Sequence, residues 1–219
     1  MTATTRVFIV DDHPLVREFL ATLIEQQPDL TICGQADDPR SALTGIAATD
    51  PDVAVVDLSL GERSGLELIR QLKTSHPRVA VLVLSMHDED LYALRALRAG
   101  ARGYIMKREA TGNVILAIRR VREGGIAVSE RVSEALAEKL VRGAAAVADS
   151  PVQALSDREL EVFRLVGEGR TTRQIADALH LSFKTVQAYY ARIKTKLGAD
   201  NALELLRDAI RWNEDQTGR

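Results

Sequence analysis

Residues 7–12, "VFIVDD", place two adjacent carboxylates directly after a short run of apolar side chains. A run that is apolar at every position predicts a strand buried on both faces, as in a parallel sheet covered by helices. Asp11 and Asp12 would then lie at the carboxyl end of this strand, where open parallel sheets bind ligands. Because neighbouring carboxylates repel each other, their position indicates a cation that offsets the charge.

The same pattern extends outward over the first 125 residues. Similar apolar runs recur at residues 30–33, 53–56, 79–84 and 103–106. Amphipathic segments of helical length alternate with these runs, at residues 14–27, 40–49, 65–76, 89–100 and 111–125. Five such repeats predict an α/β fold, a doubly wound five-stranded parallel sheet.

The rest of the chain is organised differently. Residues 126–150 have a weak apolar pattern, and we expect a linker there with at most a marginal helix. Within residues 151–219 strand signals are absent, and helical patterns cover 155–169, 171–180, 182–198 and 200–212. Ser156 and Glu159 have the spacing of a capping box, which marks the start of a helix. The sequence therefore predicts a second, smaller all-α domain.

Composition excludes several classes of protein. With 46% hydrophobic and 27% charged residues, the chain is typical of soluble globular proteins. Cys33 is the single cysteine, which excludes an internal disulfide. No apolar run reaches the roughly 18 residues that span a bilayer, and the N-terminus lacks the pattern of a secretory signal. We therefore expect a cytoplasmic protein that does not bind membranes.

Polar side chains follow four of the predicted strands. Asp11 and Asp12 follow the first strand, and Asp57, Ser85 and Lys107 come at the ends of the third, fourth and fifth. Each alone could be a cap, a turn residue or a surface charge. Together they are expected to converge, because the carboxyl ends of parallel strands meet at one edge of the sheet. Mg²⁺ is the cation that best fits such a set of hard oxygen ligands.

The segments "VDD", "VVDLSL", "LVLSM" and "GYIMK" resemble, in order and spacing, the active-site segments of response-regulator receiver domains. The resemblance implies a flavodoxin-like receiver domain at residues 1–125. It implies that Asp57 accepts a phosphoryl group from a sensor histidine kinase and that Lys107 pairs with the phosphoryl oxygens. It also implies a Mg²⁺ site formed by Asp11, Asp12, Asp57 and the backbone carbonyl of Ser59, with Asp11 acting mainly through water.

The same resemblance implies a conformational switch. Ser85 would follow the new phosphoryl oxygens, and Tyr104 would turn inward when the Ser85 hydroxyl moves. Such a switch shifts the populations of two existing conformations. Ser59 and His87 occupy positions where receivers control the access of water to the acyl phosphate. Three irregularly spaced histidines are expected at loop or cap positions rather than in a metal cluster: His13, His76 and His87.

Residues 182–198 form a basic segment, with four cations and no acid. On a helical wheel, Val186, Tyr190, Ile193 and Leu197 form the apolar stripe. The opposite face combines small side chains with groups that can bind DNA: Lys184, Gln187, Ala188, Ala191, Arg192 and Thr195. Small side chains allow close approach to base edges, glutamine can pair with adenine, and cations can hold phosphates. An ordinary solvated helix face would also carry such charge.

Residues 155–201 resemble a LuxR-type helix-turn-helix domain through Glu159, "IA" at 175–176, "TV" at 185–186 and "KLG" at 196–198. A receiver followed by this domain is similar to the NarL/FixJ group of transcriptional regulators. The resemblance implies that the following residues bind DNA: Thr172, Arg173, Lys184, Thr185, Gln187, Ala188, Ala191, Arg192 and Lys196. It also implies that the last helix dimerises through Leu203, Leu206 and Ile210.

The implied function is transcription control by phosphorylation. The expected partners are a sensor histidine kinase, double-stranded DNA with two half-sites about 10 base pairs apart, and a second copy of the chain when phosphorylated. RNA polymerase is a further candidate partner. Enzymatic activity would be limited to self-phosphorylation from a donor and slow autodephosphorylation.

Two other classes of function remain open from the residues alone. One is a metal-dependent phosphohydrolase with Asp57 as nucleophile, but Ser59 is a poor general acid at the position where such enzymes need one. The other is a receiver-shaped binding module that ignores phosphate. The intact set of polar residues at the strand ends disfavours this second class.

Overall fold

The computed structural model describes residues 4–60, 63–87, 89–141, 151–179 and 181–217. These residues belong to two compact units, Met1–Val141 and Arg142–Arg219. In these described ranges, no helix combines the length and the apolar character needed to cross a membrane.

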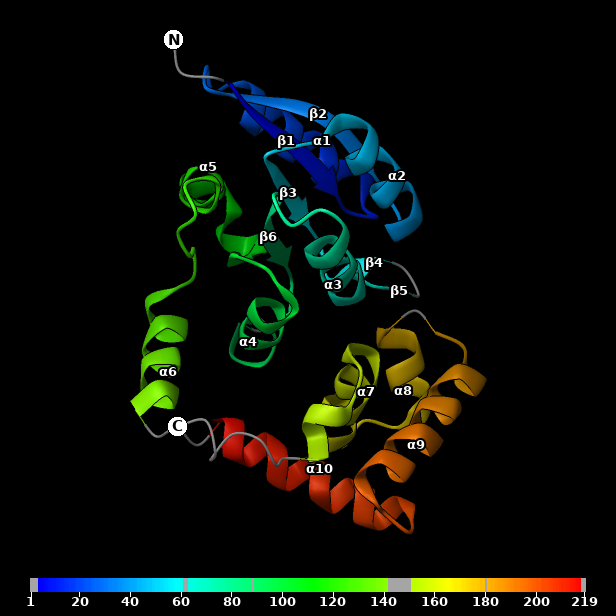
Figure 1. Cartoon of the computed structure of the whole chain (residues 1–219). Coiled ribbons are helices and arrows are strands. Elements are labelled where there is room, and N and C mark those ends of the chain that lie inside the picture. The colour runs from blue at the N-terminus through cyan, green and yellow to red at the C-terminus, as the bar shows by residue number, and fades with distance from the viewer. Residues whose placement is uncertain (1–3, 61–62, 88, 142–150, 180, 218–219) are drawn as a thin grey trace. The chain divides into compact units, whose positions relative to one another are not determined.

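The first unit is built on a five-stranded parallel sheet (Figure 1). Its strands are β1 (Thr5–Val10), β2 (Leu30–Ala36), β3 (Val53–Val56), β6 (Ala80–Ser85) and β7 (Gly103–Met106), and their order in space is β2-β1-β3-β6-β7. After β1 the chain adds β2 at one edge of the sheet. It then returns to the other side of β1 with β3 and adds β6 and β7 toward the opposite edge. This reversal places the ends of β1 and β3 side by side, which is where such sheets bind ligands. The predicted fold class is confirmed.

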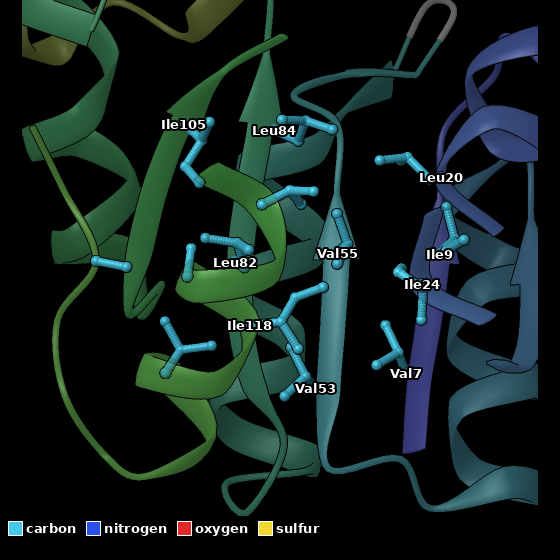
Figure 2. Close-up of a cluster of buried hydrophobic side chains, with 14 of the residues drawn as sticks. Val7, Ile9, Leu20, Ile24, Val53, Val55, Leu82, Leu84, Ile105 and Ile118 are labelled. Atoms are coloured by element: carbon cyan, nitrogen blue, oxygen red, sulfur yellow. The ribbon is translucent and has the colours of Figure 1, made fainter. Parts of the chain in front are cut away.

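Helices cover both faces of this sheet: α1 (Pro14–Glu25), α2 (Pro39–Thr49), α3 (Gly65–Ser75), α4 (Glu89–Ala99) and α5 (Ala110–Arg122). Figure 2 shows the apolar cluster on one face, where Ile24 of α1 and Ile118 of α5 pack with strand residues such as Ile9. Phe8 belongs to the other face, since a Cβ added to Gly45 of α2 would lie 2.6 Å from its ring. β1 is therefore apolar at successive positions because both of its faces are covered.

Two features of the first unit, a short antiparallel ladder and an additional helix, differ from the sequence prediction. β4 (Ser59–Leu60) and β5 (Arg63–Ser64) form an antiparallel ladder just after β3. A regular helix, α6 (Glu130–Val141), lies in the segment predicted as a linker. It contacts α4, and its Val132 is buried, so apolar packing extends the unit past residue 125 to Val141. Residues 142–150 of the predicted linker lie outside the described residues.

The second unit is all-α, as predicted. It contains a 3₁₀ turn η3 (Pro151–Ala154) and the helices α7 (Asp157–Gly167), α8 (Thr172–Ala178), α9 (Phe183–Leu197) and α10 (Ala202–Thr217). The capping box of Ser156 and Glu159 begins α7, and Thr171 and Gln174 form a second one at α8. A Cβ added to Gly167 would collide with the Ala209 carbonyl, so this glycine lets α7 approach α10 closely.

Candidate phosphorylation site and DNA interface

Three of the predicted site residues lie in direct contact at the carboxyl edge of the sheet. The Lys107 ammonium lies 2.8 Å from Oδ2 of Asp11 and 2.7 Å from Oδ2 of Asp57. Each carboxylate directly follows its strand, where a backbone bond holds it: the Asp11 N–H donates to Ala36, and the Asp57 N–H donates to Val10. Sheet register therefore fixes this cluster, and we call it, with Asp12, the acidic pocket.

Burial and charge oppose each other in the acidic pocket. Burial raises the pKa of Asp57 to about 6; the Lys107 ammonium lowers it in part, and the Asp11 carboxylate raises it further. Burial alone would lower the pKa of Lys107, but the carboxylates of Asp57 and Asp11 together raise it above its ordinary value. Lys107 thus remains a cation that only partly offsets the carboxylates around it.

The donor set of the acidic pocket fits a divalent cation. Asp11, Asp12, His13 and Asp57 each offer one donor atom, and these atoms lie within 4.8 Å of one another. Asp57 is only 3% exposed, yet its Oδ1 has no hydrogen-bond partner among the described residues. A buried carboxylate oxygen without a partner is costly unless a ligand completes its coordination. The three carboxylates of this set are hard oxygen donors, which suit Mg²⁺.

Gly65 is a site residue that the sequence reading missed. It begins α3, and its N–H donates to the Leu58 carbonyl over 2.9 Å. A Cβ at this position would collide with the Asp57 carbonyl and lie 2.7 Å from the Leu58 Cα. Any larger residue would therefore displace the turn that carries the Asp57 carboxylate.

The predicted switch residues are joined through the loop between β6 and α4. The Ser85 hydroxyl accepts a hydrogen bond from the His87 N–H over 3.2 Å. Tyr104 is 1% exposed, and its hydroxyl donates to the His87 carbonyl over 2.8 Å. The His87 ring stacks on Tyr92 and lies 2.8 Å from the Ser59 hydroxyl. His87 therefore connects the end of β6, the inward Tyr104 ring and the loop after Asp57.

The exposed face of α9 matches the helical wheel. Val186 and Ile193 are fully buried, and Tyr190 and Leu197 are half-buried. The predicted opposite face is exposed along its whole length: Lys184, Gln187, Ala188, Ala191, Arg192 and Thr195. The Arg192 guanidinium lies 5.8 Å from the Tyr189 ring centroid, which supports its position beside this face.

Lys196 differs from the other predicted DNA-binding residues because it is engaged inside the unit. Its ammonium lies 2.6 Å from Oε2 of Glu159 and donates to the Ala154 carbonyl over 3.1 Å. Glu159 is almost fully buried; burial would raise its pKa, but bonds from Lys196 and Ser156 lower it below the ordinary value. This ion pair fastens the end of α9 to the start of α7.

Comparison with known proteins agrees with both units. The response regulator receiver domain family matches residues 7–119, and the luxR family of bacterial regulatory proteins matches residues 153–209. The chain is 38% identical over 195 residues to the DNA-binding transcriptional activator DevR/DosR of Mycobacterium tuberculosis, which covers 89% of each chain. It is 34% identical over 211 residues to the oxygen regulatory protein NreC of Staphylococcus aureus, which covers 94% of this chain and 97% of NreC.

The chain is a NarL/FixJ-type response regulator. A solved structure of RcsB from Salmonella enterica serovar Typhimurium, bound to promoter rprA in the presence of the phosphomimetic BeF3-, is similar over nearly the whole chain. The likeness has 26% identity and a TM-score of 0.58, and it covers 93% of this chain and 97% of that chain. This regulator is accordingly a DNA-binding transcriptional regulator with a receiver domain and a LuxR-type domain.

The remaining predicted residues of the regulator fall into two groups. At the start of α8, Arg173 is exposed, whereas Thr172 is half-buried and shares a side-chain hydrogen bond with Tyr190. Thr185 is half-buried as well. Its hydroxyl lies 2.7 Å from that of Ser182, which caps α9. On α10, Leu203 and Ile210 are exposed and Leu206 is half-buried, as a dimerising stripe requires. Phe183, half exposed at the start of α9, was not among the predicted contacts.

Proposed function

We propose that phosphorylation of Asp57 controls how this regulator binds DNA through α9. The observation that carries the proposal is the state of the Asp57 carboxylate. It is buried, it is bonded through Oδ2 to the Lys107 ammonium, and its Oδ1 has no hydrogen-bond partner among the described residues. A carboxylate used only to stabilise the fold would not leave a buried oxygen without a partner.

The chemistry is the transfer of a phosphoryl group to Asp57. The Asp57 carboxylate attacks the phosphorus of a phosphohistidine on the sensor kinase. The phosphorus–nitrogen bond breaks, its electron pair stays on the imidazole nitrogen, and an acyl phosphate forms at Asp57. Asp11, Asp12, Asp57 and the Ser59 carbonyl would hold Mg²⁺, which when bound offsets the negative charge of the carboxylates and the phosphoryl group.

Lys107 is placed to respond to the new group. It now divides its ammonium between Asp11 and Asp57, at 2.8 and 2.7 Å. Formation of the acyl phosphate removes the charge of Asp57 and adds phosphoryl oxygens at the same place. The ammonium then pairs with these oxygens, because charge-assisted hydrogen bonds are stronger to an ionised group than to a neutral acyl group.

The switch connects this event to the loop between β6 and α4. The Ser85 hydroxyl, which accepts the His87 N–H, turns toward the phosphoryl oxygens. His87 moves with Ser85 because its N–H is bonded to the Ser85 hydroxyl. The movement reaches Tyr104 and Ser59, since the His87 carbonyl accepts the Tyr104 hydroxyl and the His87 ring contacts the Ser59 hydroxyl. Phosphorylation in this way increases the population of the conformation in which Tyr104 is buried. Slow hydrolysis of the acyl phosphate would end the signal.

DNA binding is assigned to the exposed face of α9, which enters the major groove. Gln187 reads a base edge, the small side chains of Ala188 and Ala191 allow close approach, and Lys184 and Arg192 hold phosphates. Thr185 lies in the first turn of α9, where its hydroxyl contacts the cap residue Ser182. α8 supports α9 through Thr172, and Arg173 reaches the backbone of the duplex. Pairing of two chains through Leu203, Leu206 and Ile210 places two recognition helices on two half-sites about 10 base pairs apart.

Lys196 is reassigned in this proposal from a phosphate contact to a structural residue. Its pairing with buried Glu159 leaves less of its charge for DNA. RNA polymerase and a sensor histidine kinase remain the expected protein partners of the regulator.

The test is phosphate incorporation from a small phosphodonor in the presence of Mg²⁺. The wild-type chain should take up one acid-labile phosphate at Asp57, located by mass spectrometry of peptides. Asp57→Asn keeps the shape of the side chain and should take up none, and Asp12→Ala or EDTA should slow the wild-type reaction. Undiminished phosphate on Asp57→Asn, or equal rates with EDTA, would contradict the proposed site.

A further inference from the structure

We propose that residues 124–141, here called the strap, dock on the first unit when Tyr104 is turned inward, so that phosphorylation of Asp57 fixes the helix that leads toward the DNA-binding unit. The inference rests on the proposed function and names the part of the chain that carries the signal out of the receiver domain. The strap follows the edge strand β7 and ends with α6. It is attached both to the strand that carries Tyr104 and to α4, which follows the loop of His87.

Backbone hydrogen bonds attach the strap to the outer edge of β7. The Tyr104 N–H donates to the Ala127 carbonyl over 2.8 Å, and the Ala127 N–H donates to the Arg102 carbonyl over 2.9 Å. The Arg102 guanidinium also donates to the Gly124 carbonyl over 2.8 Å. Ala127 thereby extends the sheet by one residue beside Gly103. The strap is thus held by the same residue whose side chain is the predicted switch.

Gly103 is required for this close approach. A Cβ at position 103 would lie 2.7 Å from the Ala127 carbonyl oxygen and 3.0 Å from the Ala127 Cβ. It would also lie 2.7 Å from Cδ1 of Leu82, the flexible end of a side chain in the core. Because the Ala127 carbonyl is backbone, a larger residue at position 103 would push the strap away from β7. A substitution of Gly103 therefore loosens the strap without changing α6.

Apolar packing attaches the other end of the strap, where α6 lies beside α4 (Figure 1). Val132 is buried, whereas the other side chains of α6 that the structure describes are exposed or half-buried. At the start of the helix, the Ser129 hydroxyl accepts the Val132 N–H over 3.2 Å. Docking of α6 therefore depends largely on Val132 and on a turn that directly follows Ala127.

A cavity beside Tyr104 lies next to the start of α6. Its volume is about 280 Å³, and its lining includes Tyr104, Val128 and Ser129. The Tyr104 ring is now buried, with its hydroxyl bonded to the His87 carbonyl. A ring that turned outward would leave this bond and enter the cavity against Ser129. The inward ring is therefore compatible with the docked strap, whereas the outward ring and the strap compete for the same space.

Phosphorylation and docking of the strap then favour each other. Phosphorylation increases the population in which Tyr104 is inward, and that conformation leaves room for the strap. By linkage, the docked strap stabilises the phosphorylated state by the same factor. The state of the strap is thereby passed to the chain that continues from Val141 to the DNA-binding unit.

Binding of the phosphomimetic BeF3- with Mg²⁺ to the full-length chain tests the inference, and ¹⁹F NMR measures its affinity. Val132→Asp puts a carboxylate into the buried side of α6. It should lower the affinity for BeF3- at least about fivefold, the lower end of usual allosteric coupling. Ala135→Asp is the matched control, because it adds the same charge at an exposed position of the same helix, and it should leave the affinity unchanged.

A second variant, Gly103→Ala, loosens the strap from its other end. It should also lower the affinity for BeF3-, while the amides of β3 keep their protection from hydrogen exchange. Unchanged affinity in either variant would overturn the inference. A loss of affinity with an equal loss of protection in β3 would also count against it, because it would report a destabilised sheet. Failure of the wild type to bind BeF3- would overturn the proposed phosphorylation site together with the inference.

Hydrogen exchange reports docking of the strap directly. In the wild type, BeF3- should slow the exchange of the Tyr104 amide and of the α6 amides, because the docked strap is populated more. In Asp57→Asn the same addition should change neither. BeF3- that binds the wild type but leaves the exchange of α6 unchanged would contradict the strap and leave the proposed phosphorylation site intact.

Discussion

Each unit of the regulator holds a lysine against a buried carboxylate, but the two pairs differ in how completely they are bonded. Oε2 of Glu159 accepts both the Lys196 ammonium and the Ser156 N–H, and its pKa is lowered. Asp57 shares the Lys107 ammonium with Asp11, its Oδ1 has no partner among the described residues, and its pKa is raised. The satisfied carboxylate stabilises the fold, and the incompletely bonded one is available for chemistry.

The largest expected effect comes from breaking the ion pair between Lys196 and Glu159. Lys196→Met leaves a buried carboxylate without its cation and should lower the free energy of unfolding of the second unit by about 3 kcal/mol. Trp212, the one tryptophan of the chain, packs on Phe163 of α7, so its fluorescence follows this unit during unfolding by urea. Lys184→Met, an exposed lysine on the same helix, should have little effect on stability.

A different result for Lys196 would support its assignment from the sequence as a DNA-binding residue. If Lys196→Met unfolds like the wild type but lowers the salt dependence of DNA binding by about one unit, the side chain is a phosphate contact.

Breaking the ion pair between Lys107 and Asp57 should change the free energy of unfolding in the opposite direction. In EDTA at neutral pH, Asp57→Asn removes a charge that burial disfavours and should raise the stability of the first unit by about 2 kcal/mol. Hydrogen exchange of the β3 amides, read by mass spectrometry, measures this unit separately. A loss of stability would mean that the Lys107 contact outweighs burial of the carboxylate.

The same reasoning predicts a pH dependence for the first unit. The pKa of Asp57 is about 6 in the folded chain and 3.8, its ordinary value, in the unfolded chain, so the folded state binds this proton more tightly. Its unfavourable contribution is therefore absent well below pH 4, grows as pH rises to about 6, and is constant above. The stability gain of Asp57→Asn in EDTA should shrink between pH 7 and pH 5. A gain that is equal at both values would contradict the raised pKa.

Glu159 should behave in the opposite way on acidification. Because its folded pKa is lowered, its stabilising contribution is present above the unfolded value of about 4.5 and is lost as pH falls through the folded pKa. Trp212 fluorescence during acid titration follows this loss in the second unit. Glu159→Gln should show a weaker dependence on pH in that range.

The smallest effects are expected on the surface of α9. Gln187→Ala should weaken binding to the preferred site by at least about 1 kcal/mol and change binding to random DNA much less. Lys184→Ala should weaken both and lower the slope of log affinity against log salt by about 1. Fluorescence anisotropy on both duplexes at two salt concentrations measures the difference. An equal loss on both duplexes for Gln187→Ala would place this residue on the DNA backbone.

The acidic pocket was largely predictable because strand ends can be read locally. Buried apolar runs locate the ends of β1, β3, β6 and β7, and parallel pairing then brings Asp11, Asp57 and Lys107 together. Contacts between distant segments were not predictable in the same way. Lys196 and Glu159 are 37 residues apart, and a helical wheel cannot show that one side chain folds back onto another helix.

The most direct measurement of the central claim compares the DNA affinity of the full-length regulator with and without a small phosphodonor, in the presence of Mg²⁺. Fluorescence anisotropy on a duplex with two half-sites should show that phosphodonor tightens binding of the wild type at least tenfold and leaves Asp57→Asn unchanged. Tightening of Asp57→Asn by the same factor would contradict control of DNA binding through Asp57.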